Sequence, residues 1–348
     1  MRSSTCTQVQ RDSCAVVSRM QLVLHVAIAM LFSACKPDRL PTPPPPPPAL
    51  WEVTNLNVSC VGGPASITDV WVRPNGSVVA IESRSRVIVY SQGVWECVYQ
   101  RQMGLTAVWA SDSQIVAVGD STTSETTTWG LIVTFDGTEW SDSLVGHQSS
   151  WRVLQCVWGR SESEVYAGGF FGTRYRFDGS SWTDITQRAS SVETAIHGNR
   201  DLIVMVGEYN DQISSRECML SVLEGPGEVF KDESCPAGSR IEDVVVLPNS
   251  RVVAIASEQI LERDSNGNWH VVPIPLSVTQ LSSVWGIDDD HIFAAGSDAI
   301  LLRYEAEQWR EMQNPVTWSV RLLAGASLGT LVAFGDSRTE FMRYAESE

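Results

Sequence analysis

The chain has 348 residues, of which 43% are hydrophobic and 19% charged, and its 41 acidic and 25 basic side chains give a formal net charge of −16. A chain of this length and apolar content can bury a large core. Lysine occurs only at Lys36 and Lys231, and no cluster of Lys and Arg appears. Because phosphate binding without sequence preference requires clustered cations, nucleic acid is not expected as a partner.

Residues 1–34 have the composition of a secretory signal peptide. The segment 22–32 is largely apolar, and three arginines precede it. Such a segment is too short to span a bilayer as a helix, but it is typical of the core of a signal peptide. We therefore predict that this part of the chain is removed on export.

The segment Leu31–Cys35 resembles the lipobox of bacterial lipoproteins. Ser33 and Ala34 supply the small residues before Cys35, while Phe32 stands where the family usually has leucine. The resemblance implies cleavage before Cys35 and transfer of a diacylglyceryl group to its sulfur, because a thiolate is a strong nucleophile. An ordinary signal peptide that is cleaved nearby is the alternative.

Residues 35–50 are predicted to form a proline-rich tether. Pro37 and Pro41 precede the run Pro43 to Pro48, and such a stretch adopts polyproline II at about 3.1 Å per residue and acts as a stiff spacer. A docking site for a proline-binding partner is the alternative. In lipoproteins a residue other than Asp after the cysteine, here Lys36, implies transfer to the outer membrane. We therefore predict a lipid-anchored protein of the bacterial cell envelope, on the outer membrane or the cell surface.

From residue 51 onward one pattern recurs seven times at a spacing of roughly forty residues, which is typical of repeat folds built from small antiparallel units. Each copy begins with a short apolar run, and a second run rich in Val, Ile and Ala follows at once, as expected for strands. The residues that end the first runs are Trp71, Trp109, Trp158, His197, Val245, Trp285 and Ala324.

A third run in each copy leads into a turn rich in Asp, Asn and Gly, residues that tolerate the positive φ of tight hairpins. An aromatic residue opens a fourth run after each turn. These aromatic residues are Trp51, Trp95, Trp140, Trp182, Phe230, Trp269 and Trp309. Four strands per copy and seven copies predict an all-β, seven-bladed β-propeller of four-stranded blades.

The ends of the chain are predicted to share one blade. The fourth-strand aromatics begin at Trp51, ahead of the first blade, whereas the chain ends soon after the third run of the last repeat. We therefore predict that residues 50–56 complete the last blade and close the ring, which leaves no unpaired inner sheet edge. The single propeller domain then covers residues 51–348.

Two resemblances to known propellers bear on function. The turn pattern Phe-Asp-Gly-x-x-Trp, at Phe135–Trp140 and Phe177–Trp182, resembles a degenerate Asp-box of BNR-type propellers, in which the box is structural. Sialidases of that type need an arginine triad, a tyrosine nucleophile and acidic partners, and these cannot be placed residue by residue in this chain. The longer pattern Val157–Trp182 is similar to repeats of secreted bacterial propellers of the YVTN/WD40-like superfamily and, more distantly, to photosystem assembly factor propellers, which implies protein binding.

Insertions in the repeat mark a candidate binding surface. Residues 121–130 and 208–216 lengthen the connection between the second and third strands of the second and fourth blades, and residues 145–151 lengthen the connection into the third. Because loops on a rigid scaffold collect binding residues, we predict a ligand or partner surface there; drift of exposed loops is the alternative. The surface residues are Trp129, His147, Trp151, Phe170, Phe171, Arg174 and Tyr209.

After the lipobox five cysteines remain, and an exported chain can oxidise them. One pair flanks the turn 225–227 almost symmetrically, so that paired strands would set its members within disulfide reach. The candidate pairs are Cys218 with Cys235 and Cys60 with Cys97. Cys156 is expected to be a small buried hydrophobe. No spacing of Cys and His matches a metal site, so that neither a metal nor another cofactor is predicted.

Two further features have a structural and a functional interpretation. The tryptophans that end the first strands could stack on sugars, but Trp at a fixed place in each blade more often packs between sheets. Asp288–Asp290 could hold calcium, but it occupies a turn between strands, where a solvated turn is expected.

We therefore predict a membrane-anchored, monomeric, non-catalytic propeller that binds a protein or glycan partner at the cell envelope. No catalytic residue is assigned. The alternative is a carbohydrate-active, sialidase-like enzyme, for which a convergent acid pair with arginine in the central pocket would be the evidence.

Overall fold

The computed structural model describes residues 51–102, 104–124, 127–146, 153–187, 190–209, 217–225, 229–275 and 277–345. Residues 49–348 form one compact unit. The predicted signal peptide, Cys35 and the tether lie outside the described residues. In the part of the chain that is described, no helix is long and apolar enough to cross a bilayer.

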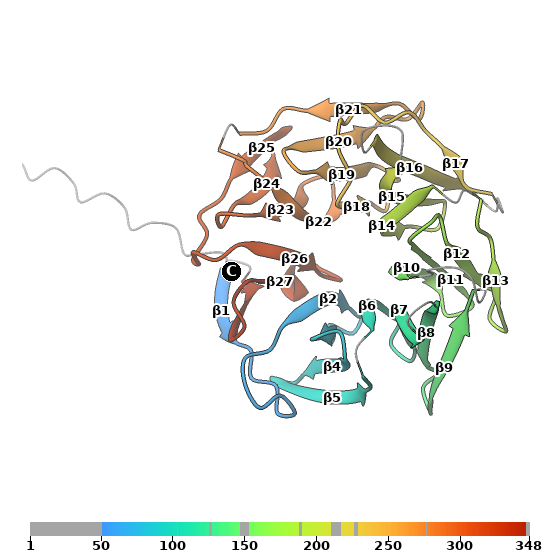
Figure 1. Cartoon of the computed structure of the whole chain (residues 1–348). Coiled ribbons are helices and arrows are strands. Elements are labelled where there is room, and N and C mark those ends of the chain that lie inside the picture. Colours follow the sequence, from blue (N-terminus) through green and yellow to red (C-terminus); the bar gives the residue numbers. More distant parts are fainter. Residues whose placement is uncertain are drawn as a thin grey trace, which may run out of the picture. The chain divides into compact units, whose positions relative to one another are not determined.

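Seven antiparallel sheets of four strands each are arranged in a ring as the blades of a propeller (Figure 1). The first strand of each blade lines the centre, and the fourth lies at the rim. Among the described residues the only helical element is the short 3-10 turn η2 (Leu328–Thr330). The prediction of an all-β, seven-bladed propeller is confirmed.

Blades 1 to 4 follow one another in chain order. Blade 1 contains β2 (Ile67–Val72), β3 (Val78–Glu82), β4 (Arg86–Ser91) and β5 (Val94–Gln100). Blade 2 contains β6 (Leu105–Ala110), β7 (Ile115–Ser124), β8 (Thr127–Phe135) and β9 (Trp140–Val145). Blade 3 contains β10 (Leu154–Ser161), β11 (Glu164–Gly169), β12 (Arg174–Phe177) and β13 (Trp182–Asp184). Blade 4 contains β14 (Ser191–Gly198), β15 (Leu202–Tyr209), β16 (Glu217–Glu224) and β17 (Lys231–Asp232).

Blades 5 to 7 complete the ring. Blade 5 contains β18 (Asp243–Val246), β19 (Val252–Ala256), β20 (Gln259–Arg263) and β21 (Trp269–Val272). Blade 6 contains β22 (Leu281–Asp288), β23 (His291–Gly296), β24 (Leu301–Glu305) and β25 (Gln308–Glu311). Blade 7 contains β26 (Val320–Ala324), β27 (Val332–Gly335), β28 (Glu340–Tyr344) and, at its outer edge, β1 (Trp51–Asn55).

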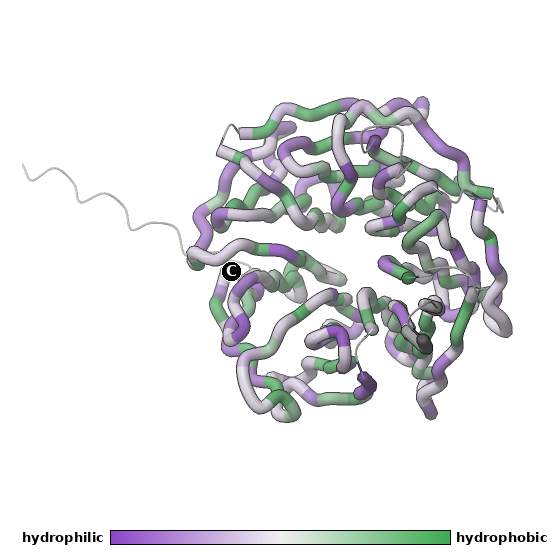
Figure 2. The backbone as a smooth tube through the Cα atoms, viewed as in Figure 1, coloured by the Kyte–Doolittle hydropathy of each residue, from purple (hydrophilic) through white to green (hydrophobic). Residues whose placement is uncertain are grey.

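The strands differ in burial according to their place in the blade. All five residues of β3 and of β19 are buried, whereas the four central residues of the rim strand β9 are exposed. Hydrophobic residues are accordingly concentrated within the blades (Figure 2). A continuous apolar run is expected for a strand that is covered on both faces, because neighbouring blades pack against both faces of each sheet.

The closing strand pairs with the last strand as predicted. β1 runs antiparallel to β28 in a register that extends from Trp51 opposite Tyr344 to Asn55 opposite Glu340. The Trp51 side chain is only 2% exposed, and its ring meets Tyr344 edge-on at a centroid distance of 5.3 Å. The predicted closure of the ring by an N-terminal strand is therefore confirmed.

The segment after β1 ties the closing strand to both of its neighbours. The Leu56 amide donates to the Thr339 carbonyl of blade 7 over 2.7 Å. On the other side, a disulfide bond joins Cys60 to Cys97 in β5 of blade 1, with the Cα atoms 6.2 Å apart. The join between the two ends of the chain is thus held by a strand ladder and by a covalent link.

A second disulfide bond supports the rim of blade 4. The strand β17 has two residues, which pair with Ser221 and Val222 of β16. Cys218 and Cys235 lie at positions that continue this antiparallel register, and a disulfide bond joins them with Cα atoms 6.0 Å apart. Cys156 is the free cysteine among the described residues, and it is buried.

Three of the tryptophans that end the first strands, Trp109, Trp158 and Trp285, pack against glycines of the next blade. A Cβ atom on Gly159 of blade 3 would lie 2.6 Å from the Trp109 ring of blade 2, and one on Gly325 of blade 7 would lie 2.6 Å from the Trp285 ring of blade 6. Only glycine leaves room for the indole at this distance. The structural interpretation of Trp109 and Trp285, which are 4% and 8% exposed, therefore agrees with the structure.

Because the strands are antiparallel, the connections alternate between two faces. The turn face carries the connections between first and second strands and between third and fourth strands. The loop face carries the connections between second and third strands and the connections between blades. The predicted binding surface falls on the loop face.

On the turn face, polar links join the first turns of neighbouring blades. The Asn75 amide donates to Asp112 over 3.1 Å, and the Asn199 side chain donates to the Leu247 carbonyl over 2.8 Å. The Asp288–Asp290 turn takes part in this pattern, because Asp289 accepts hydrogen bonds from Asn249 and Arg251. The Asp289 carboxylate, and that of Asp288 through His291, therefore have protein partners, in keeping with a structural turn.

The Asp-Gly turns between third and fourth strands are stabilised by their aspartates. Asp136 accepts from the amides of Thr138 and Glu139 over 2.8 and 2.9 Å, and Asp178 accepts from the amides of Ser180 and Ser181 over 2.8 Å each. Hydrogen bonds from the following side-chain hydroxyl and amides lower the pKa of both aspartates to about 2. These hydrogen bonds fix the turns, in keeping with a structural role for both aspartates.

Candidate functional site

The structure places four of the five described members of the predicted binding surface on the loop face of blades 2, 3 and 4. Trp129 lies in β8, Phe170 and Phe171 follow β11, and Tyr209 ends β15. His147 and Trp151 lie outside the described residues. These four residues therefore share one face of the ring, and their role in binding stays a prediction.

The insertion in blade 2 is a strand extension where a loop was expected. Ser121 and Thr122 of β7 pair with Trp129 and Thr128 of β8, beyond the point where Gly130 pairs with the last residue of β9. Thr and Trp have high β propensity, so that the added residues prolong the hairpin. The sequence count located the insertion correctly but not its conformation.

Phe171 occupies an unusual backbone conformation for an aromatic residue. It has φ +56° and is followed by Gly172 at φ +65°, and the Thr173 amide closes the turn onto the Phe170 carbonyl over 3.2 Å. This is a type I′ hairpin turn, in which Asn, Asp or Gly is preferred. The equivalent residues of blades 1 and 6 are Ser83 and Asp298, so blade 3 alone of these three carries a large apolar side chain there.

The Phe171 side chain stays about half exposed in this conformation. It is 48% exposed, and its ring lies 6.4 Å from that of Phe170. A bulky residue in the left-handed region costs of the order of 1–3 kcal/mol and persists where the surroundings or a function require it. The two rings form an apolar projection on the loop face.

The predicted surface position of Arg174 is wrong. Its side chain is 3% exposed, and its guanidinium pairs with Glu193 of blade 4 over 2.9 Å. Burial raises the pKa of Glu193, while Arg174 opposes that rise. Arg174 opens β12 next to the exposed turn, so its position in the sequence suggested exposure, but β12 directs the side chain into the blade 3–blade 4 interface.

This buried pair lies beside a cavity of about 220 Å³ at the interface of blades 3 and 4. Most residues around it come from the loop-face ends of their strands or from the connection between the two blades, whereas Phe230 lies in the connection that leads into β17. The cavity is lined by Arg174, Gln187, Ser191, Tyr209, Phe230 and Asp232.

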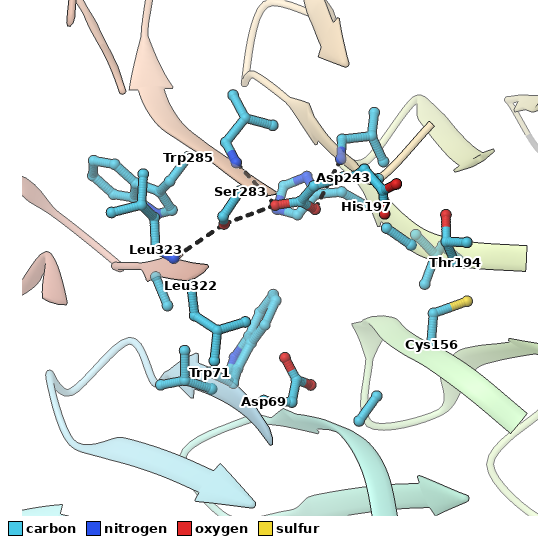
Figure 3. A pocket seen from close by; sticks show the side chains of 18 of the residues that line it. Asp69, Trp71, Cys156, Thr194, His197, Asp243, Ser283, Trp285, Leu322 and Leu323 are labelled. Atoms are coloured by element: carbon cyan, nitrogen blue, oxygen red, sulfur yellow. Dashed lines mark hydrogen bonds between the residues drawn. The ribbon is translucent and has the colours of Figure 1, made fainter. Parts of the chain in front are cut away.

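A larger cavity of about 450 Å³ occupies the centre of the ring, and the first strands of all seven blades line it. Asp69 of blade 1 and Asp243 of blade 5 face it together with His197 and Ser283 (Figure 3). The Trp71 ring reaches across the centre to within 6.3 Å of the His197 ring. Polar groups from four blades therefore meet at the axis.

The polar side chains that line this central cavity, called the channel below, form hydrogen bonds to the first strands of neighbouring blades. Asp69 accepts from the Val108 amide of blade 2 over 2.7 Å. Asp243 accepts from the Ser283 hydroxyl and the Val284 amide of blade 6, each over 2.9 Å. These bonds join blades that β ladders do not connect, and they explain why acids are tolerated in the interior.

Burial determines how these groups titrate. It raises the pKa of Asp69 to about 7 and that of Asp243 to about 6, and backbone hydrogen bonds oppose both shifts. Burial also lowers the pKa of His197 to about 4, and its Nδ1 accepts from the Val246 amide over 3.0 Å. Both aspartates are partly reached by water, since they line the cavity.

The channel does not assemble a nucleophile with a base among the described residues. Burial raises the pKa of the Cys156 thiol well above its usual range, and the Ser283 hydroxyl donates to a carboxylate while accepting from the Leu323 amide over 3.0 Å. The described lining has no tyrosine, and its arginines Arg84 and Arg240 are paired with acids. The set of side chains that a sialidase requires is not brought together there.

No family model matches the chain, and no curated protein matches it. Solved structures do resemble it. A structure of YCF48 bound to a D1 peptide is 17% identical with a TM-score of 0.65, and the alignment covers 88% of this chain and all of that one. Inactive virginiamycin B lyase from Staphylococcus aureus with quinupristin is 9% identical with a TM-score of 0.63, and 84% of this chain and 98% of that chain are covered.

The structure of U3-55K is 14% identical with a TM-score of 0.61, and the alignment covers 83% of this chain and 97% of that chain. At these identities the likeness shows the fold, a β-propeller that serves both binding proteins and an enzyme. The function of this chain must therefore be argued from its own residues.

Sequence reasoning missed the interior acids and the cavity between blades 3 and 4. Asp69, Asp243 and Ser283 each stand two residues before the residue that ends the first strand, so a comparison of this one position across the repeats would have found them. The cavity has no such signal, because its lining comes from separate segments that only the packing of two blades brings together.

Proposed function

We propose that the chain is a non-catalytic binding propeller of the bacterial cell envelope, anchored through a lipid on Cys35, and that a protein partner binds the loop face of blades 2 to 4. The observation that carries the proposal is Phe171. A half-exposed aromatic side chain in a left-handed turn lowers stability without filling the core, which is the signature expected of a recognition residue.

Two further observations support a protein partner. Phe170, Phe171, Trp129 and Tyr209 all lie on this face, and aromatic side chains dominate the energetics of protein interfaces. The similar YCF48 structure carries a peptide, and peptide binding is therefore compatible with this fold.

The binding face is tested with a matched pair of variants on the two faces. Phe171→Asn removes the ring and suits the left-handed backbone, while Val94→Asn changes a residue that is 56% exposed near a turn-face hairpin. Peptides that bind the full chain are first selected from a random display library. We expect these peptides to bind the Val94→Asn variant as tightly as the parent and the Phe171→Asn variant at least tenfold more weakly. Equal binding to both variants would reject the proposed face.

The anchor is tested independently of the binding face. With Cys35→Ser the sulfur that the lipobox resemblance assigns to the lipid is lost. We expect the protein to move from the membrane fraction to the soluble fraction of the envelope, with unchanged melting temperature. Retention in the membrane fraction would contradict the lipid anchor and leave the binding proposal in place.

A further inference from the structure

A further cavity lies on the turn face, at the junction of blade 1 with blade 7. Its volume of about 610 Å³ is within the range of roughly 300–1,000 Å³ that is typical of ligand pockets. Its walls come from the first turn of blade 1, the hairpin between β4 and β5, and the end of β28. The charged residues of the described lining are Arg73 and Arg343, although acids outnumber basic residues by 41 to 25 in the whole chain.

Arg73 occupies the same place in its blade as Arg160 of blade 3. Each stands two residues after the tryptophan that ends the first run of its repeat. In both blades that tryptophan lies opposite the residue eight positions later, so the first turns have equal length. Arg160 pairs with Glu164 over 2.8 Å, whereas blade 1 has Ser77 at the equivalent position. Blade 1 therefore lacks the acid that neutralises the arginine of blade 3.

The guanidinium of Arg73 is left without a full set of acceptors. The side chain is partly buried, and its Nε has no hydrogen-bond acceptor among the described residues. Burial lowers the pKa of Arg73, and the charge of Asp112 opposes this shift without cancelling it. An unpaired donor of a buried charged group lowers stability, and a bound anion would supply the missing acceptor.

Arg343 places a second guanidinium at the same cavity. It lies near the end of β28, and its side chain is exposed. Two acids lie nearby, since Asp112 accepts from the Asn75 amide over 3.1 Å and Glu52 is opposite Arg343 in the ladder of β1 and β28. Neither acid comes within the 4.0 Å of an ion pair with Arg73 or Arg343. Two such guanidinium groups suit an anion with several oxygens, because each planar fork can bind two of them.

The place of the N-terminal strand indicates where such an anion would come from. β1 begins at Trp51, which lies opposite Tyr344 at the turn-face end of blade 7 (Figure 1). The chain from Cys35 therefore reaches the propeller beside this cavity. The fifteen residues between Cys35 and Trp51 would span about 45 Å as polyproline II. A lipid on Cys35 would thus hold the turn face within reach of phospholipid headgroups.

We propose that Arg73 and Arg343 bind the phosphate of an anionic phospholipid, which orients the turn face toward the membrane and the proposed partner surface away from it. The inference rests on the proposed function, because the anchor brings the cavity to the lipid. The net charge of −16 opposes the approach to an anionic membrane, but at physiological ionic strength exposed charges are screened beyond about 8 Å. Acids on distant blades are therefore screened from the headgroup, and the two arginines act on it directly.

Vesicle flotation tests the site without the anchor. A chain that begins at Lys36 lacks the signal segment and the lipid but contains every strand of the closed ring. We expect it to bind vesicles of phosphatidylcholine with phosphatidylglycerol, and not phosphatidylcholine alone. Arg73→Gln and Arg343→Gln should each weaken binding about fivefold, as expected for the loss of one basic residue near an anionic surface. Arg310→Gln removes an exposed arginine of the rim strand β25, and this control should bind as the parent does.

Restoring the acid that blade 3 has gives a second test. Ser77→Glu places in blade 1 the carboxylate that Glu164 supplies to Arg160. We expect it to pair with Arg73 and to weaken vesicle binding at least fivefold, with an unchanged or higher melting temperature. Ser163→Glu adds the same charge to the exposed first turn of blade 3 and should leave vesicle binding unchanged.

The outcomes separate this inference from the proposed function. Equal binding by the parent and the variants at positions 73, 77 and 343, or an equal loss in Arg310→Gln, would overturn the site. Soluble glycerol phosphate that binds as tightly as the vesicles, with the same dependence on Arg73, would assign the cavity to a soluble phosphate and overturn the membrane orientation. Because the assay uses neither the anchor nor Phe171, its failure leaves the proposed function standing. Failure of the Cys35→Ser test rejects the anchor whatever the vesicles show.

Discussion

The two faces of the ring differ in how their connections are held. On the turn face, short connections of neighbouring blades bind one another, as Asn75 binds Asp112 and Asn199 binds Leu247. On the loop face, insertions lengthen the second connections of blades 2 and 4, and the tight turn of blade 3 leaves Phe171 half exposed. The turn face therefore serves mainly to join blades, and the loop face has residues that the fold does not need.

The comparison is tested most strongly by two tryptophans of blade 2. Trp109 is buried against Gly159 of the next blade, so Trp109→Ala should cost about 3–5 kcal/mol of unfolding free energy. Trp129 lies in the hairpin on the loop face and is less buried, so Trp129→Ala should cost less than about 1 kcal/mol. Denaturant titration measures both, and equal losses would contradict the division of roles.

The join between the chain ends is expected to give the next largest effect. Replacing Cys60 and Cys97 together with Ser removes a covalent link across 37 residues of sequence, which should lower stability by about 2–4 kcal/mol. Hydrogen exchange should rise first in the closing strand Trp51–Asn55, because only non-covalent contacts then hold the join. A uniform rise of hydrogen exchange over all blades would show that the disulfide bond does not specifically stabilise the closing strand.

Asp69 gives a smaller, pH-dependent effect. Its folded-state pKa of about 7 lies above the unfolded value near 3.9, so its contribution to stability is present below the unfolded pKa and is lost as the pH rises through about 7. Asp69→Asn can still accept from the Val108 amide but cannot ionise.

We therefore expect the variant and the parent to have equal free energies of unfolding near pH 4, and the variant to be more stable by about 1 kcal/mol at pH 8. This difference is smaller than the free energy that corresponds to the whole pKa shift, because water reaches the channel and screens the charge. Denaturation at both pH values measures this. A parent that is stabilised relative to the variant at pH 8 would mean that the carboxylate form is preferred in the fold.

The smallest effect on stability is expected at the proposed recognition residue. Phe171→Asn places in a type I′ turn a residue that the turn prefers. The free energy of unfolding should therefore stay constant or rise by up to about 1 kcal/mol, with a matching small rise in melting temperature. Calorimetry of this variant, beside Val94→Asn as the control, measures the change. A clear loss of stability would show that the Phe171 ring supports the fold.

The features that recur in every repeat could be predicted from the sequence, whereas the conformation of an insertion in a single repeat could not. Seven copies of one pattern predicted the blades and the role of Trp51, because closure follows from counting strands. The extended hairpin at Ser121–Ser124 was expected as a loop, since an insertion in a repeat shows where residues are added but not whether they pair.

Arg174 shows a second limit of the sequence. Whether a residue at the start of a strand points to solvent or into the blade interface depends on register and on the neighbouring blade, and a single sequence does not determine these. The same holds for the interior acids Asp69 and Asp243, whose partners are backbone amides of the next blade.

The most direct test of the proposed binding face is photo-crosslinking in the native envelope. A photoreactive phenylalanine analogue is placed at position 171 on the loop face and, in a second strain, at position 94 on the turn face. The account predicts a discrete protease-sensitive adduct from position 171 and none from position 94. Adducts from position 94 alone, or equal adducts from both, would contradict the assignment of partner binding to the loop face of blades 2 to 4.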